Sequence, residues 1–229
     1  MRYECEQVEL KRKDDGTDLY LTKFWCPASW QDKNILMVHG LTYTQHVFDI
    51  KYKDYSVCEY FAKNGYTVWR LDLSGYGKSG KYEDGWKVTT QHAAEDEIYA
   101  LEKICELQGV EKLDLLGWSW GTMTTSEVAS QRPDLLKKVV WLGPCFGGAF
   151  EATPVTELHG MWVDHTYAQD GGHGRPNGGA KEIMEIGDGW LIDTKAVKLL
   201  HLHGAGHAMY LEKDYYQTTR EAILKFISE

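Results

Sequence analysis

The segment LDLLGWSWGT at residues 113–122 carries the residue types of a nucleophile on a sharp turn. It reads as an apolar strand, then Gly117-x-Ser119-x-Gly121, then a helix. Glycines two positions before and after the serine allow backbone packing that any Cβ would prevent, and such a turn presents the hydroxyl at a helix N-terminus. The pattern predicts that Ser119 is a nucleophile. The alternative is a serine that caps the helix between two spacer glycines.

A serine hydroxyl reacts only when a base takes its proton, so a histidine must lie nearby in the fold. His207 is the candidate, in the segment LLHLHGAGHAMYLE at residues 199–212. It follows the last apolar run and precedes the last expected helix, where Gly204 and Gly206 let a loop bring the imidazole over the edge of a sheet. A solvent-exposed loop histidine is the alternative if His207 is taken alone.

Acyl transfer also needs donors that stabilise a negatively charged oxygen. His39-Gly40-Leu41 directly follows an apolar strand, and we expect the backbone N–H groups of Leu41 and Trp120 to form this oxyanion hole. A plain turn at His39 is the alternative. Trp118 and His39 are expected to line an apolar substrate pocket, although core packing explains the tryptophan rings equally well.

Two other kinds of site are considered and rejected. Residues 77–79, Gly-Lys-Ser, imitate a phosphate-binding loop, but the glycine required five positions earlier is Asp72, a carboxylate that would repel phosphate. His201, His203 and His207 could suggest a metal site, yet no carboxylate accompanies them at ligand spacing. We therefore expect neither a nucleotide nor a metal.

Four motifs in this order resemble the α/β-hydrolase superfamily, in its serine-hydrolase branch with a cap or lid segment. The motifs are residues 35–41, DLSGYGKS at residues 72–79, GWSWG at residues 117–121 and GAGH at residues 204–207. The likeness covers residues 30–145 and 199–228. It implies a mostly parallel sheet of eight strands, a serine nucleophile, a histidine base, no cofactor, and a structural role for residues 72–79.

The order of apolar runs predicts an α/β fold. The first 25 residues alternate polar and apolar around Asp15-Gly16, which predicts an antiparallel hairpin with a tight turn at the sheet edge. The following runs predict a mostly parallel sheet with helices on both faces. Strands are expected at residues 35–38, 67–73, 113–116, 139–142 and 197–202. Helices are expected at residues 91–108, 119–131 and 215–227, and another around Val57, Tyr60 and Phe61 that stops at Asn64-Gly65.

The predicted organisation is a core interrupted by one insertion. Residues 1–143 form the first part of the hydrolase core, residues 144–196 a lid, and residues 197–229 the last strand, the base loop and the C-terminal helix. The lid assignment rests on the length of the stretch without a convincing strand and on its clustered glycines.

The sequence departs from the family pattern in the carboxylate that should orient the histidine base. In relatives a carboxylate that orients the base follows the strand before the last, and here that strand is not recognisable. We infer that one strand–helix unit between Lys198 and Leu199 is missing, with Glu151 and Asp164 as the remaining candidates for the acid. A serine–histidine pair without this acid would react more slowly.

Composition excludes several classes of protein. The chain has 229 residues and a net charge of −9, so its field repels phosphate backbones and nucleic acid is not expected as a partner. No apolar run has the ~20 residues of a membrane span, and we expect a soluble, cytoplasmic protein without a signal peptide. Five scattered cysteines indicate reduced thiols rather than a disulfide framework.

The sequence thus predicts a serine hydrolase that cleaves a small ester or lactone through an acyl-enzyme, without a cofactor. A carbon–carbon bond hydrolase could use the same residues. A non-catalytic ligand-binding protein on the same scaffold is the third hypothesis, because fold does not fix function.

Overall fold

One six-stranded sheet organises the described part of the chain. The computed structural model describes residues 2–144, 200, 202 and 204–229. The strands are β1 (Glu4–Lys11), β2 (Asp18–Trp25), β3 (Lys33–Val38), β4 (Tyr66–Asp72), β5 (Leu113–Trp118) and β6 (Leu136–Leu142). Their order is β1-β2-β4-β3-β5-β6. β1, β2 and β4 pair antiparallel, whereas β4, β3, β5 and β6 run parallel.

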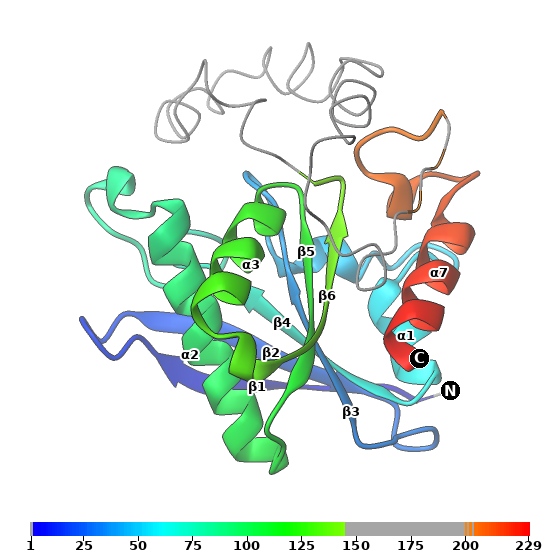
Figure 1. Cartoon of the computed structure of the whole chain (residues 1–229), viewed down its shortest axis with the longest axis horizontal. Coiled ribbons are helices and arrows are strands. Elements are labelled where there is room, and N and C mark those ends of the chain that lie inside the picture. The colour runs from blue at the N-terminus through cyan, green and yellow to red at the C-terminus, as the bar shows by residue number, and fades with distance from the viewer. Residues whose placement is uncertain (1, 145–199, 201, 203) are drawn as a thin grey trace.

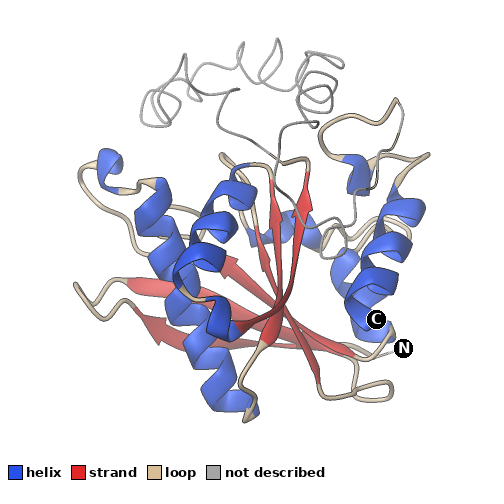
Figure 2. Cartoon of the chain, in the orientation of Figure 1, coloured by secondary structure: helices blue, strands red, loops and turns tan. Residues whose placement is uncertain are grey.

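Helices cover both faces of this sheet (Figures 1 and 2). The helix pair α2 and α3 lies on one face, and α1 and α7 lie on the other. The helices are α1 (Val57–Lys63), α2 (Thr90–Gln108), α3 (Trp120–Gln131) and α7 (Tyr216–Ser228), with short 3₁₀ turns at Gln45–Phe48, Gly85–Lys87, Pro133–Leu135 and Met209–Leu211. The predicted mostly parallel α/β fold with an antiparallel N-terminal hairpin is confirmed.

Alternation along the strands divides the core between the two faces. In β3, Leu36 and Val38 join the apolar cluster under α2 and α3, whereas Ile35 and Met37 join the cluster under α1 and α7. Residues alternate in this way because successive side chains of a strand point to opposite faces. A continuous apolar run therefore fits a strand buried on both sides, as the sequence predicted.

Capping residues next to the chain ends of α1 and α2 set where these helices begin and end. Gly109 ends α2 with φ 65°, the left-handed conformation that glycine adopts without a steric penalty. At the start of α1, the hydroxyl of Ser56 accepts a hydrogen bond from the Glu59 N–H at 3.0 Å. The cap at Gly109 explains why the predicted end of α2 at Gln108 agrees with the structure, and α1 ends at Lys63, next to the predicted stop at Asn64-Gly65.

The hairpin loop differs from the prediction. Lys11 pairs with Asp18, so residues 12–17 form a six-residue loop rather than a tight two-residue turn. Gly16 has a positive φ of 76°, but Asp15 is not among the positive-φ residues of the described chain. The longer loop allows the Arg12 side chain to enter the protein, where it is 2 % exposed.

The loop after β4 has the structural role that the resemblance implied. Asp72 is fully buried and accepts hydrogen bonds from the backbone N–H groups of Gln45 (2.7 Å) and Lys78 (2.9 Å). The Ser79 hydroxyl donates to the Asp72 carbonyl and accepts from the Tyr20 N–H at 2.8 Å. The carboxylate of Asp72 thus binds backbone N–H groups of its own loop and of the segment after β3, which fixes both loops.

Several predictions fall on residues outside the described chain. Apart from Pro144, the lid assignment lies there, as do Glu151, Asp164 and the missing strand–helix unit. Of the strand expected at residues 197–202, Leu200 and Leu202 are described, and neither lies in a strand. No helix within the described residues has both the length and the apolar character of a membrane span.

Candidate active site

Ser119 occupies the turn between β5 and α3. Its backbone angles are φ 58° and ψ −124°, a conformation that residues with a Cβ rarely adopt. The Ser119 N–H donates to the carbonyl oxygen of Leu142 at 3.0 Å, which ties the turn to the end of β6. A Cβ at position 117 would lie 2.2 Å from the Gly121 carbonyl oxygen. The turn therefore has the close backbone packing that its glycines predicted.

His207 lies beside the same turn. The Trp118 Nε1–H donates to the His207 carbonyl oxygen at 3.0 Å, and the centroids of the two rings are 5.6 Å apart. The imidazole also faces Gly143, where an added Cβ would lie 2.9 Å from Nδ1. Because the Ser119 N–H is bonded to Leu142, the serine and the histidine are anchored on consecutive residues at the end of β6.

The predicted oxyanion donors, Leu41 and Trp120, belong to segments that adjoin Ser119. A Cβ added to Gly40 would lie 2.7 Å from the Ser119 Cβ, so the backbone that leads to Leu41 contacts the serine directly. Within the described residues, no protein atom accepts a hydrogen bond from the Leu41 N–H. Trp120 begins α3, so its N–H belongs to the positive end of that helix. The contacts bring the segments that carry these two N–H groups next to the turn at Ser119, and their role as oxyanion donors stays a prediction.

Within the described residues, His39 is buried and its two ring nitrogens lie against backbone groups. Its side chain is fully buried; Nδ1 lies 2.8 Å from the Gly40 carbonyl oxygen, and Nε2 accepts from the Leu73 N–H at 3.3 Å. Burial lowers the pKa of His39, which agrees with a neutral ring that carries its proton on Nδ1. His39 thus fixes the loop that bears Leu41, and its expected place on a pocket surface needs this correction.

The two tryptophans beside Ser119 are also buried rather than exposed. Trp118 is 2 % exposed and packs edge-on against Tyr43, with ring centroids 4.9 Å apart. Trp120 is 1 % exposed, donates from Nε1 to Thr90 Oγ1 at 3.1 Å, and lies 5.8 Å from the Tyr76 ring. Tyr43 and Tyr76 therefore present the aromatic surface that the sequence analysis assigned to the tryptophans.

A cavity of about 350 Å³ adjoins this aromatic surface. Residues 42–44, which follow Leu41, form one side of it, and residues 75–77 form another. Lys81, Tyr82, Gly85 and Val88 complete the lining. Since Tyr43 contacts Trp118 and Tyr76 contacts Trp120, the cavity lies beside the residues that flank the nucleophile. Its size is at the lower end for small-molecule sites.

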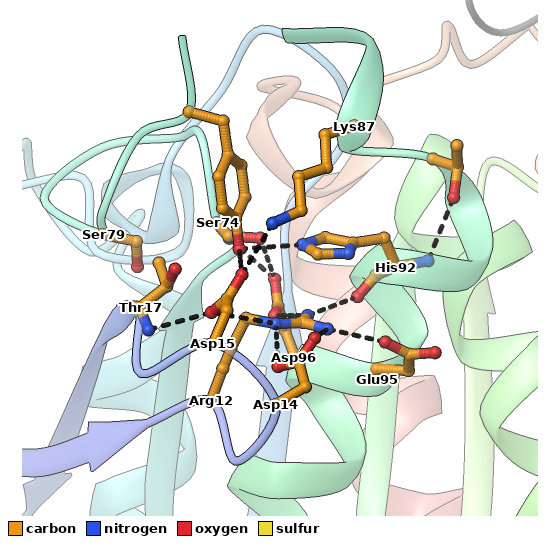
Figure 3. Close-up of polar contacts among 12 residues, drawn as sticks. Arg12, Asp14, Asp15, Thr17, Ser74, Ser79, Lys87, His92, Glu95 and Asp96 are labelled. Carbon is orange, nitrogen blue, oxygen red and sulfur yellow. Dashed lines mark hydrogen bonds and ion pairs between the residues drawn. The ribbon is translucent and has the colours of Figure 1, made fainter. Parts of the chain in front are cut away.

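A charged cluster lies next to Tyr82, one of the residues that line the cavity, and Figure 3 shows its polar contacts. Arg12 reaches Asp96 at 2.5 Å, Glu95 at 2.6 Å and Asp14 at 2.9 Å. Asp15 accepts from Lys87 Nζ at 2.8 Å, and this bond holds the pKa of Asp15 well below its ordinary value. The cluster joins the hairpin loop to the start of α2 and to the segment around Lys87.

Sequence reasoning missed this cluster and one residue beside the base. KRKDDGTD at residues 11–18 has the composition of an exposed turn, and no pattern in it signals a buried arginine. Glu212 accepts from the Gly206 N–H at 3.1 Å and so fixes the loop that carries His207. A carboxylate six residues after a loop glycine matches no recognised motif.

Comparison with known proteins agrees with this architecture. A family model described as alpha/beta hydrolase fold matches residues 33–171. A predicted CIB-like hydrolase from Thermoplasma acidophilum is 19% identical, with a TM-score of 0.61 over 97% of this chain and 99% of that one.

Two plant enzymes are also similar over part of their length. Epoxide hydrolase I from potato (Solanum tuberosum) is 22% identical over 72% of this chain, with a TM-score of 0.53. An epoxide hydrolase from Vigna radiata is 20% identical over 72% of this chain, with a TM-score of 0.52. The chain covers 47% and 48% of these two enzymes, about half of their length.

Proposed function

The chain belongs to the alpha/beta hydrolase family, and from that premise we propose that it is a serine hydrolase that cleaves a small ester or lactone through an acyl-enzyme. The observation that carries the proposal is the strained backbone of Ser119, whose N–H is bonded to Leu142, together with the His207 ring against Gly143, the next residue along the chain. Acyl transfer requires a hydroxyl at a helix N-terminus and an imidazole that can reach it, and this anchoring supports such an arrangement.

In the proposed mechanism, Ser119 Oγ attacks the carbonyl carbon while His207 takes the hydroxyl proton. The N–H groups of Leu41 and Trp120 donate to the oxygen that becomes negatively charged. His207 then gives its proton to the leaving alcohol, which departs and leaves the acyl group on Ser119. Water, deprotonated by His207, releases the acid and restores the hydroxyl.

The identity of the nucleophile favours an acyl substrate over an epoxide. If a serine hydroxyl opened an epoxide ring, the product would be an alkyl ether between enzyme and substrate. Water does not cleave an ether under these conditions, so the enzyme would be consumed rather than regenerated. An acyl-serine ester is hydrolysed readily, which makes Ser119 consistent with catalytic turnover of an ester or lactone.

The proposal also includes a reducing, cytoplasmic location. The described cysteines Cys5, Cys26, Cys58 and Cys105 are free thiols. Proteins that work in oxidising compartments commonly pair such residues, whereas the cytosol keeps them reduced.

The test compares p-nitrophenyl acetate and butyrate turnover and fluorophosphonate labelling in three proteins: wild type, Ser119→Ala and Ser126→Ala. Ser126 is a matched control because it lies on α3 and its hydroxyl donates to the Thr122 carbonyl oxygen at 2.6 Å. We expect Ser119→Ala to abolish labelling and to lower kcat by at least about a thousandfold. Ser126→Ala should retain both activities.

The other outcomes separate the competing hypotheses. Labelling that survives Ser119→Ala would contradict the assigned nucleophile. Labelling of Ser119 without turnover of any ester in a panel would point to a carbon–carbon bond hydrolase. If the wild type neither labels nor turns over, the non-catalytic ligand-binding hypothesis is favoured.

A further inference from the structure

The hairpin loop, residues 12–17, bonds directly to residues 82–88 through Asp15, and to residues 74–77 indirectly, through Asp96 (Figure 3). Both segments contribute residues to the cavity lining, and we call residues 74–77 and 82–88 together the polar wall. The hairpin loop belongs to the edge of the sheet, whereas the polar wall follows β4 and precedes α2. Contacts between them therefore join parts of the chain that are far apart in sequence.

The first connection runs through Arg12 and Asp96. Arg12 NH1 donates to Asp96 Oδ1 at 2.5 Å. The other carboxylate oxygen, Oδ2, accepts from both the N–H and the hydroxyl of Ser74, at 2.8 and 2.6 Å. Ser74 is followed by Gly75, which lines the cavity. The hairpin loop thus fixes the backbone at the start of the polar wall.

The second connection runs through Asp15. Its Oδ2 accepts from the Tyr82 hydroxyl at 3.0 Å and from Lys87 Nζ at 2.8 Å, while Oδ1 accepts from the Thr17 N–H at 3.0 Å. Tyr82 lines the cavity, and Lys87 precedes Val88, which also lines it. The Lys87 ammonium lies 4.0 Å from the centroid of the Tyr82 ring. One carboxylate therefore holds two side chains of the second half of the polar wall.

We propose that Asp15 is a positioning residue for substrate binding, and that it fixes Tyr82 and Lys87 so that the polar wall keeps its shape around the substrate. This inference rests on the proposed function, because it takes the cavity as the substrate site. Asp15 acts through its neighbours and touches no reacting atom. Its loss should weaken binding much more than it slows the chemical step.

The neighbouring Asp14 supplies a matched control. It lies in the same loop and bonds to Arg12 at 2.9 and 3.0 Å. Among the described residues, the side-chain bonds of Asp14 go to Arg12 and not to Tyr82 or Lys87. Asp14→Asn and Asp15→Asn therefore remove the same charge from adjacent positions, and only the second removes the contact with the cavity lining.

The experiment measures two quantities on the full chain for wild type, Asp14→Asn and Asp15→Asn. Amide hydrogen exchange of residues 82–88, read by mass spectrometry, reports whether the polar wall is held in place. Ester hydrolysis gives KM and kcat separately. We expect Asp15→Asn to speed exchange of this segment about fivefold and to raise KM about fivefold, with kcat changed less than about twofold. Asp14→Asn should leave all three near wild type.

Three results would overturn the proposal: unchanged exchange in Asp15→Asn, equal effects in the two variants, or a fall in kcat at constant KM. A melting temperature measured on each protein separates a local effect from global unfolding. If the wild type shows neither labelling of Ser119 nor turnover, the proposed function fails. The exchange data then still decide whether Asp15 holds the polar wall.

Discussion

Around Ser119, the segment after β3, strand β5 and helix α3 pack against one another without intervening side chains, whereas charged side chains support the polar wall of the cavity. A Cβ at Gly40 would meet the Ser119 Cβ at 2.7 Å, and one at Gly117 would meet a carbonyl oxygen at 2.2 Å. Behind the polar wall, the buried Arg12 instead pairs with Asp96 and Glu95.

The difference shows two ways of fixing a site. Direct backbone contact allows little movement of the atoms involved. It can therefore hold a nucleophile in position to within a fraction of an ångström. Ion pairs and hydrogen bonds connect segments that cannot pack closely, and they depend on each partner keeping its charge. The first kind of support should be sensitive to added volume, and the second to removed charge.

The largest effect is expected from Gly117→Ala. The added Cβ would overlap the Gly121 carbonyl oxygen, a backbone atom that cannot rotate away, so the turn that carries Ser119 must distort. We expect a loss of about 4 kcal/mol or more in the free energy of unfolding, together with loss of Ser119 labelling. Urea unfolding and fluorophosphonate labelling measure the two effects.

Gly85→Ala is the matched control for that substitution. A Cβ at Gly85 would meet no atom within 4 Å, so the change should cost less than about 0.5 kcal/mol. If Gly117→Ala were as mild as Gly85→Ala, close backbone packing would not be what holds the nucleophile.

The next effect is expected from Arg12→Met. It leaves the fully buried Asp96 without its cation, and breaking a buried ion pair from one side costs about 3–5 kcal/mol. The control is Arg132→Met, because Arg132 pairs with Asp134 and Glu102 while about a third of its side chain is exposed. Its removal should cost less than about 1 kcal/mol. Equal costs in urea unfolding would mean that the charged cluster does not support the polar wall.

The smallest effect concerns Glu97, which follows Asp96 on α2 but faces the helix that begins after Ser119. Its carboxyl is fully buried, and neither oxygen has a hydrogen-bond partner among the described residues. The nearby Thr124 hydroxyl donates to the Gly121 carbonyl oxygen at 3.1 Å. Burial raises the pKa of Glu97 well above 4.5, so the native side chain stays protonated where the unfolded one ionises.

Wild-type stability should therefore fall as pH rises from about 4.5 to the raised native pKa, by about 1.4 kcal/mol per pH unit. Glu97→Gln removes this dependence, so its stability relative to wild type should increase over the same range. The exposed Glu106→Gln serves as the control and should show no such trend. Parallel pH profiles for wild type and Glu97→Gln would contradict a protonated Glu97.

The sequence predicted those features that depend on local chemistry. Gly117 and Ser119 identified the turn after β5, and the apolar run before them identified the strand. Gly109 marked the end of α2 through its left-handed conformation. In each case the residue type is required by a backbone conformation or a burial pattern within a few positions, so a single sequence contains the necessary information.

The remaining features depend on contacts between distant segments. Arg12 is buried because Asp96, far along the chain, supplies a countercharge, and nothing in the hairpin loop itself reveals this pairing. The orientation of His39 likewise depends on the Leu73 N–H. Tyr43 and Tyr76 line the cavity because the loops after β3 and β4 lie next to each other, and the sequence alone does not show this arrangement.

The most direct test of the account is to trap the covalent intermediate. Wild-type protein is mixed with p-nitrophenyl acetate, quenched in acid within the first turnover, digested and mapped by mass spectrometry. We expect one acetyl group on the peptide that contains Ser119, and none at that position in Ser119→Ala. Substrate turnover with no acyl group on Ser119, or acylation of another residue that disappears on chase, would contradict it.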